Sequence, residues 1–80
     1  MDNGRNLFRY RTERSGKVVL DGGGVIDCLI RDISSGGVRI EVTNPAQVPD
    51  KFVLTIQGMP DKYRCRVTWR TGNKLGVEYL

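Results

Sequence analysis

Histidine is absent from this sequence of 80 residues, and cysteine occurs only twice. Without histidine the chain lacks the commonest general base at neutral pH and the commonest metal ligand. Two cysteines, Cys28 and Cys65, cannot hold a zinc ion by themselves. Both fall on the apolar faces of predicted strands, where cysteine acts as a small hydrophobe. We therefore expect neither an enzyme nor a metal or cofactor site.

Long apolar segments are also missing. No stretch approaches the length of a membrane-spanning helix, and residues 1–5 have none of the apolar character of a signal peptide. We therefore expect a cytoplasmic protein with no membrane span. The length suits one small domain and leaves no room for a second one.

Positive charge is present in excess and gathers near the N-terminus. The chain has 13 Lys and Arg against 9 Asp and Glu, a net charge of +4, and residues 1–17 alone contribute five basic and two acidic side chains. This segment has little apolar periodicity. We predict a basic, flexible arm over residues 1–15, placed to meet an anion such as a phosphate; the alternative is a solvated tail that aids solubility.

From residue 16 onward, short apolar runs alternate with turns rich in glycine and proline. Strict alternation of apolar and polar residues is typical of strands with one buried face. It is clearest over residues 62–70, where it predicts that Trp69 points inward and that Arg66 and Arg70 point outward. The predicted strands cover residues 17–20, 25–33, 38–42, 51–56, 62–70 and 75–79.

Six strands, each with one apolar face, need a closed arrangement that leaves no exposed edges. At this length a small antiparallel β-barrel is the simplest solution, and so few strands would make thin sheets in a sandwich. We predict an all-β fold, a six-stranded antiparallel barrel in meander-like order over residues 16–80.

Two short motifs carry the functional prediction. The first is R-x-x-x-R in the arm, formed by Arg5 and Arg9, whose guanidinium groups can grip phosphate oxygens or a guanine edge with two hydrogen bonds. The second is D-x-S-x-x-G, formed by Asp32, Ser34 and Gly37. Its carboxylate can accept from guanine N1–H and the exocyclic amine, and its serine can donate to phosphate. Taken alone, the second motif is more typical of an ordinary turn, in which Asp and Ser bond to the local backbone and Gly supplies a positive φ.

In this order the two motifs resemble the PilZ domain family of bacterial cyclic-di-GMP receptors. The resemblance covers roughly residues 5–80 and is closest to the short stand-alone PilZ proteins of alphaproteobacteria. It extends over the segments Val25–Cys28, Val48–Phe52, Cys65–Arg70 and Leu75–Tyr79.

The resemblance implies a six-stranded barrel, a cyclic-di-GMP ligand, and no catalytic activity. It implies that Arg5 and Arg9 wrap around the ligand and that Asp32, Ser34 and Gly37 bind it on the barrel surface. Arg11 and Arg31 match no motif position and are at most secondary phosphate contacts. Since 80 residues leave no room for an output domain, we expect the signal to pass to a separate, unidentified partner protein.

Two other functions stay open. A PilZ fold that binds no nucleotide could serve protein contacts alone. A small basic barrel could bind single-stranded nucleic acid, which requires exposed aromatic side chains for stacking. The pattern turns Tyr63, Trp69 and Tyr79 inward and leaves only Phe8 and Tyr10 for that role, so we do not expect nucleic acid to be the ligand.

Overall fold

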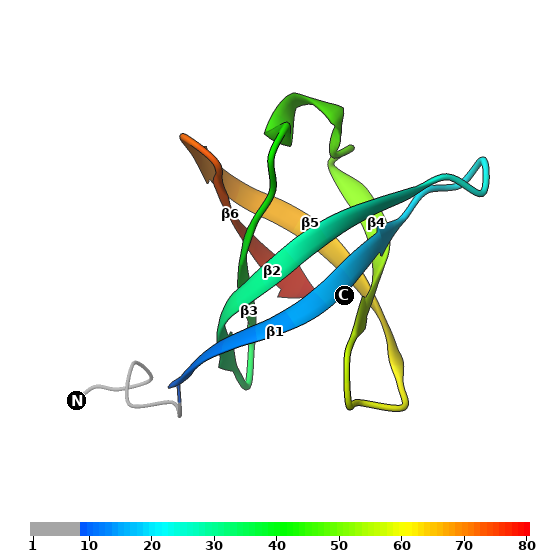
Figure 1. Ribbon diagram of the computed structural model, residues 1–80. Coiled ribbons are helices and arrows are strands. Elements are labelled where there is room, and N and C mark those ends of the chain that lie inside the picture. The colour runs from blue at the N-terminus through cyan, green and yellow to red at the C-terminus, as the bar shows by residue number, and fades with distance from the viewer. Residues whose placement is uncertain (1–8) are drawn as a thin grey trace.

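The computed structural model describes residues 9–80, which form a closed barrel of antiparallel strands (Figure 1). The elements are β1 (Arg9–Val19), β2 (Val25–Ser34), β3 (Gly37–Glu41), a single 3-10 turn η2 (Pro45–Gln47), β4 (Lys51–Ile56), β5 (Lys62–Thr71) and β6 (Lys74–Tyr79). The prediction of an all-β, six-stranded antiparallel barrel is confirmed. Within residues 9–80 no helix is long and apolar enough to cross a membrane.

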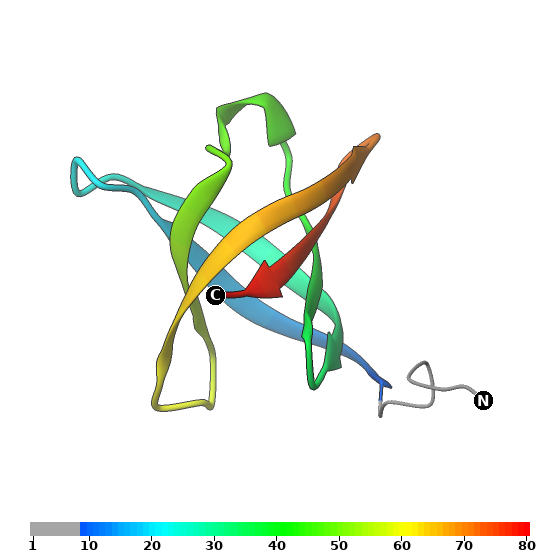
Figure 2. The same cartoon turned by 180° about the vertical axis from the view of Figure 1, so that it is seen from behind.

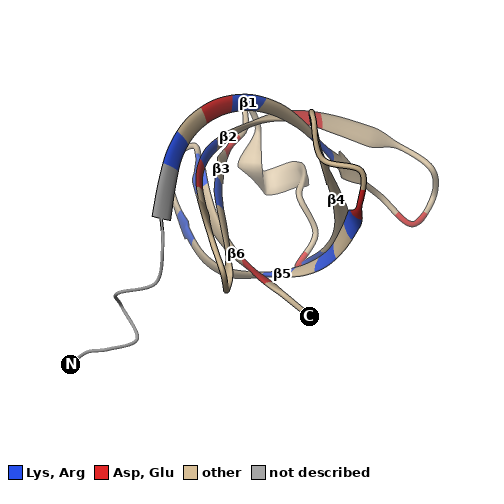
Figure 3. Ribbon diagram, turned by 90° about the horizontal axis from the view of Figure 1, so that it is seen from below, with Lys and Arg blue, Asp and Glu red and all other residues tan. Residues whose placement is uncertain are grey.

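The order of the strands around the barrel is β1-β2-β3-β6-β5-β4, and β4 closes the ring by pairing with β1. The expected meander-like order is therefore wrong after β3, whose neighbour is β6 rather than β4. The chain leaves β3 and crosses the end of the barrel through η2, as the view along the barrel shows (Figure 3). Val48, which follows η2, is 2% exposed and helps to close this end. From behind, β4 and β5 are seen to form a long hairpin (Figure 2).

Apolar side chains from every strand fill the barrel. The most regular strand is β4, in which Phe52, Leu54 and Ile56 are buried and the residues between them are not. Val38, Ile40 and Val42 are buried as well, and the predicted inward positions of the two cysteines are confirmed. The buried core consists of Val18, Cys28, Ile30, Val38, Ile40, Val42, Val48, Phe52, Leu54, Ile56, Cys65, Leu75 and Val77.

The first strand is much longer than predicted. It begins at Arg9 rather than at residue 17, so the expected end of the arm at residue 15 falls inside β1. The N-terminal part of β1 pairs with β2 from Arg9 onward, whereas β4 pairs only with Gly16–Val19. The β1 residues before Gly16 are therefore paired with β2 but do not cover the core. Because they do not cover the core, their sequence shows no alternation of apolar and polar residues. Residues 1–8 of the arm lie outside the described residues.

Candidate functional site

Three of the six strands carry a register shift. These β-bulges fall between Arg11 and Arg14 in β1, between Ile30 and Asp32 in β2, and between Val67 and Trp69 in β5. A bulge adds one residue to a strand and so turns the following side chains to the opposite face. All three bulges change which side chains reach the outer surface of the barrel.

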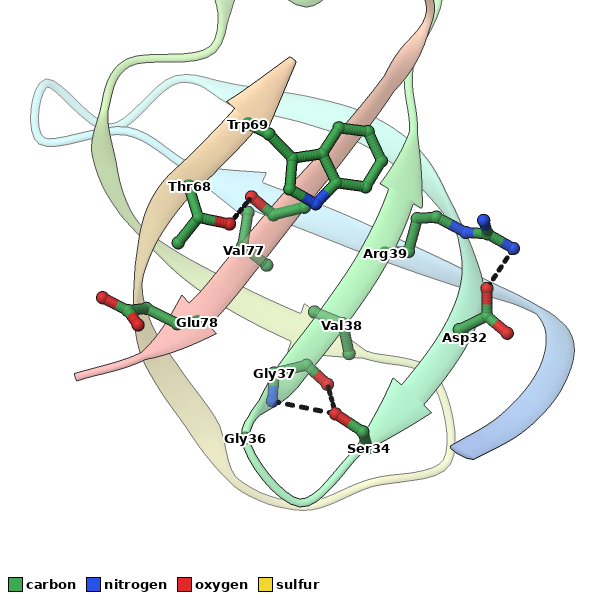
Figure 4. Close-up of a pocket in the computed structure, with 11 residues that line it drawn as sticks. Asp32, Ser34, Gly36, Gly37, Val38, Arg39, Thr68, Trp69, Val77 and Glu78 are labelled. Atoms are coloured by element: carbon green, nitrogen blue, oxygen red, sulfur yellow. Dashed lines mark hydrogen bonds and ion pairs between the residues drawn. The ribbon is translucent and has the colours of Figure 1, made fainter. Parts of the chain in front are cut away.

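The bulge in β2 determines the position of Asp32. Continuing the alternation of Cys28 and Ile30 would send Asp32 into the core. Instead, the extra residue makes Asp32 the cross-strand partner of Arg39, whose neighbours along β3 are buried core residues. Since cross-strand partners share a face, Asp32 lies on the outer surface. It is nevertheless only 4% exposed, because Arg39 lies over it and forms an ion pair with its carboxylate (Figure 4).

The bulge in β5 likewise determines the position of Trp69. Its cross-strand partner is Gly76, and its side chain is 42% exposed, so the prediction that Trp69 points inward is wrong. A Cβ atom on Gly76 would overlap the indole ring, which lies over β6 (Figure 4). The extra residue, Thr68, donates a hydrogen bond of 3.1 Å to the Gly76 carbonyl.

These positions belong to one row across the barrel. Cross-strand partners run from Arg11 to Asp32, Arg39, Gly76 and Trp69, which joins five of the six strands. Because partners share a face, the row places a carboxylate, two arginines and an aromatic ring on the same outer surface.

The rest of the second motif borders this row. Ser34 Oγ accepts a hydrogen bond from Gly37 N–H at 3.3 Å and donates one to the Gly37 carbonyl at 3.1 Å, which closes the β2–β3 hairpin. A Cβ on Gly37 would overlap the carbonyl oxygen of Val77. Gly37 is therefore required by the close approach of β6. The explanation from the sequence that this glycine supplies a positive φ is wrong, because positive φ is found elsewhere, at Gly23, Gly58 and Gly72.

An open cleft of about 320 Å3 lies between these residues (Figure 4). Its lining includes Asp32, Ser34 and Gly37 from the motif, together with Arg39 and Trp69. A second carboxylate, Glu78, also lines it and is held by Arg66, whose Nε donates at 2.9 Å. Both acidic side chains of the cleft are thus paired with an arginine.

Arg9, the second arginine of the first motif, is paired in the sheet with a residue that lines this cleft. The backbone of Arg9 is the cross-strand partner of Ser34, while Arg5 lies outside the described residues. The fold therefore brings the backbone of Arg9 next to the second motif. The sequence interpretation missed Trp69 and Arg39 as site residues. A glycine between two core residues, in Leu75-Gly76-Val77, was the available signal that something packs on the outside of β6.

Reactive groups are sparse in the described part of the chain. Burial raises the pKa of Cys28 to about 12 and that of Cys65 to about 11, so both thiols stay protonated at neutral pH and are poor nucleophiles. Among the described residues no group of His, Cys, Asp and Glu is arranged to hold a metal ion.

Comparison with known proteins identifies the class of the fold. The sequence matches the PilZ domain model over residues 3–80. The chain belongs to the PilZ domain family, whose members are nucleotide-binding adaptor domains. Its structure is similar to the crystal structure of an uncharacterized Legionella protein, with a TM-score of 0.63 and 19% identity, over 90% of this chain and 75% of that one. No curated protein matches the chain in sequence.

Proposed function

We propose that this protein is a cytoplasmic cyclic-di-GMP receptor without catalytic activity, and that it passes the signal to a separate partner protein. The observation that carries the proposal is the strand register, which sets Arg9 opposite Ser34 and Arg11 opposite Asp32. The backbone of Arg9, from the first motif, thereby lies beside Ser34 of the second motif at one end of the β1–β2 ribbon. The free, buried thiols suit a reducing compartment.

Side chains of the cleft and of the arm offer contacts that suit different parts of the ligand. The Asp32 carboxylate can accept from guanine N1–H and the exocyclic amine. The exposed indole of Trp69 can stack on a base, since every base has a π face. Arg5 and Arg9 can hold the phosphates with charge-assisted hydrogen bonds. The volume of about 320 Å3 is at the lower end for small-ligand pockets, so the cleft holds part of the ligand and the arm contacts the rest.

Exposure of Trp69 removes part of the argument against a nucleic-acid ligand, which assumed that this side chain is buried. The two carboxylates that line the cleft, Asp32 and Glu78, still disfavour a polyanion, because groove binding of single strands relies on continuous positive charge.

Calorimetric titration with cyclic-di-GMP tests the proposal, with GTP and single-stranded DNA as competing ligands. We expect saturable binding of cyclic-di-GMP that Arg5→Ala and Arg9→Ala each weaken, with a smaller salt dependence than the wild type because phosphate contacts are lost. Arg64→Ala is the matched control, since it removes an equal charge from an exposed position on β5. Tighter binding of DNA than of cyclic-di-GMP would refute the proposal.

A further inference from the structure

The ion pair that covers Asp32 is incompletely hydrogen-bonded. Within the described residues, the buried side-chain polar atoms without a hydrogen-bond partner are Asp32 Oδ2 and Arg39 Nε. Asp32 Oδ2 touches a terminal nitrogen of Arg39, but the contact lacks the geometry of a hydrogen bond. Native proteins leave few buried polar atoms unpaired, because each one loses its bonds to water. Such a pair in a candidate binding site therefore indicates a missing partner.

The chemistry of the two atoms defines that partner. One is an acceptor and the other a donor, and they belong to cross-strand neighbours that both line the cleft. The matching ligand edge presents a donor beside an acceptor. Guanine does so with N1–H and O6, and its exocyclic amine adds a second donor for the carboxylate. Adenine presents the reverse order, an N6 amine toward the arginine and the N1 lone pair toward the carboxylate, and so clashes with both.

We propose that Arg39 is a specificity-determining residue, which donates to guanine O6 while Asp32 accepts from N1–H and the exocyclic amine. This inference rests on the proposed function and adds a second residue that recognises the guanine base. In the structure the two side chains satisfy part of each other's charge. When the base enters, Arg39 moves, because its side chain is 38% exposed whereas that of Asp32 is 6% exposed.

Other arginines near the cleft are less suited to this role. Arg31, the extra residue of the β2 bulge, has a side chain that is 37% exposed and contacts Glu41 at 3.8 Å. Arg66 is held by Glu78 through two contacts of its guanidinium group. Arg31 therefore provides a matched control for Arg39 in charge and exposure.

The test compares Arg39→Met and Arg31→Met by calorimetric titration with three cyclic dinucleotides, which carry guanine, hypoxanthine or adenine. Hypoxanthine keeps O6 and N1–H but lacks the exocyclic amine. We expect Arg39→Met to weaken binding of the guanine and hypoxanthine ligands by the same factor, about tenfold or more. The ratio of guanine to adenine affinity falls accordingly, whereas Arg31→Met leaves this ratio unchanged. Arg39→Lys, which keeps the charge, restores part of the ratio.

Three results would overturn the inference while leaving the proposed function intact. Unchanged or tighter binding of cyclic-di-GMP by Arg39→Met would mean that Arg39 only covers Asp32. An equal loss for all three ligands would mean that Arg39 acts through its charge alone. A loss for the guanine ligand without one for the hypoxanthine ligand would place the contact away from O6. Failure of the wild type to bind cyclic-di-GMP would instead refute the proposed function itself. Circular dichroism and thermal melts of each variant confirm that the barrel is folded.

Discussion

Strands β4 and β5 pair with each other along the barrel, yet they relate to their sequences in different ways. In β4 every second residue is buried, as the apolar pattern predicts. In β5 the pattern is just as regular, but Trp69 lies outside because Thr68 is an extra residue opposite β6. The contrast shows how the barrel separates two tasks. Unbroken alternation builds the core, and interrupted alternation delivers side chains to the cleft.

The same contrast holds within β2. Cys28 and Ile30 follow the alternation into the core, and Asp32, after the bulge, leaves it. Two of the residues that we propose to bind the ligand, Asp32 and Trp69, therefore stand just after irregularities. Residues that stabilise the fold occupy the regular parts of the strands. Substitutions in the regular parts of the strands should therefore lower the free energy of unfolding, whereas substitutions just after the bulges should weaken ligand binding.

The largest effect on stability is expected in the regular region. Leu54→Ala removes a fully buried side chain from β4 and should lower the free energy of unfolding by about 2–5 kcal/mol. Trp69→Ala, although it removes a larger side chain, should lower it by no more than about 1.5 kcal/mol because the ring is partly in water. Chemical denaturation of both variants checks this order. A greater loss for Trp69→Ala would show that the bulged face is part of the core.

For ligand binding, the largest effect is expected from a residue that follows a bulge. Asp32→Ala should weaken cyclic-di-GMP binding by roughly 1.5–3 kcal/mol, the scale of hydrogen bonds to a charged group, and should reduce discrimination of guanine from adenine. Arg66→Ala, whose spacing to Arg70 matches the first motif by coincidence, should change affinity little because Arg66 already pairs with Glu78. Calorimetry measures both. Normal binding by Asp32→Ala would place the ligand elsewhere.

Alkaline pH should lower the stability of the barrel by ionising the two cysteines of the core in the unfolded chain. The thiols of Cys28 and Cys65 have an ordinary pKa of 9.0, which burial raises to about 12 and about 11. The unfolded chain therefore loses protons that the folded chain keeps. The stability that the two neutral thiols provide is fully present well below pH 9 and is lost as the pH rises from 9 toward 11 and 12. Between pH 8 and 10 the free energy of unfolding should fall by about 2–3 kcal/mol. Denaturation at several pH values tests this, and the double variant Cys28→Ala, Cys65→Ala should show a flatter profile.

A smaller effect is expected at the end of β5 beyond its bulge. The Arg70 guanidinium donates to the carbonyls of Pro45 and Val48, each at 2.9 Å, and to Asp50 at 3.1 Å. The prediction that Arg70 points outward is therefore wrong in direction. Beyond the bulge its cross-strand partner is the core residue Leu75, so its side chain, although exposed, leaves β5 on the inner face at the end of the barrel. Arg70→Met should lower stability by about 1 kcal/mol, since these bonds are partly exposed, and should leave ligand affinity unchanged. Arg64→Met, on the exposed face of the same strand, is the control in the same denaturation experiment.

The sequence predicts the fold well because burial leaves a pattern of period two, which β3 and β4 follow throughout. It predicts the second motif because Asp, Ser and Gly have recognisable chemistry at a fixed spacing. It does not predict that Trp69 points outward or that Asp32 lies beside Arg39, because both depend on bulges, in β5 and in β2, that are set by the register with a neighbouring strand. One extra residue opposite a partner leaves no mark in the strand's own alternation. The first half of β1 is not predicted as a strand for a related reason, since it pairs with β2 without covering the core.

The most direct test of this division is a two-dimensional amide NMR titration of the protein with cyclic-di-GMP. We predict that the shifts concentrate at Asp32–Arg39, at Thr68 and Trp69 with the Trp69 indole N–H, and at Gly76–Glu78. Amides of β4 from Lys51 to Ile56 should stay in place. The largest changes in β4, or binding that leaves the Trp69 indole unmoved, would contradict the account.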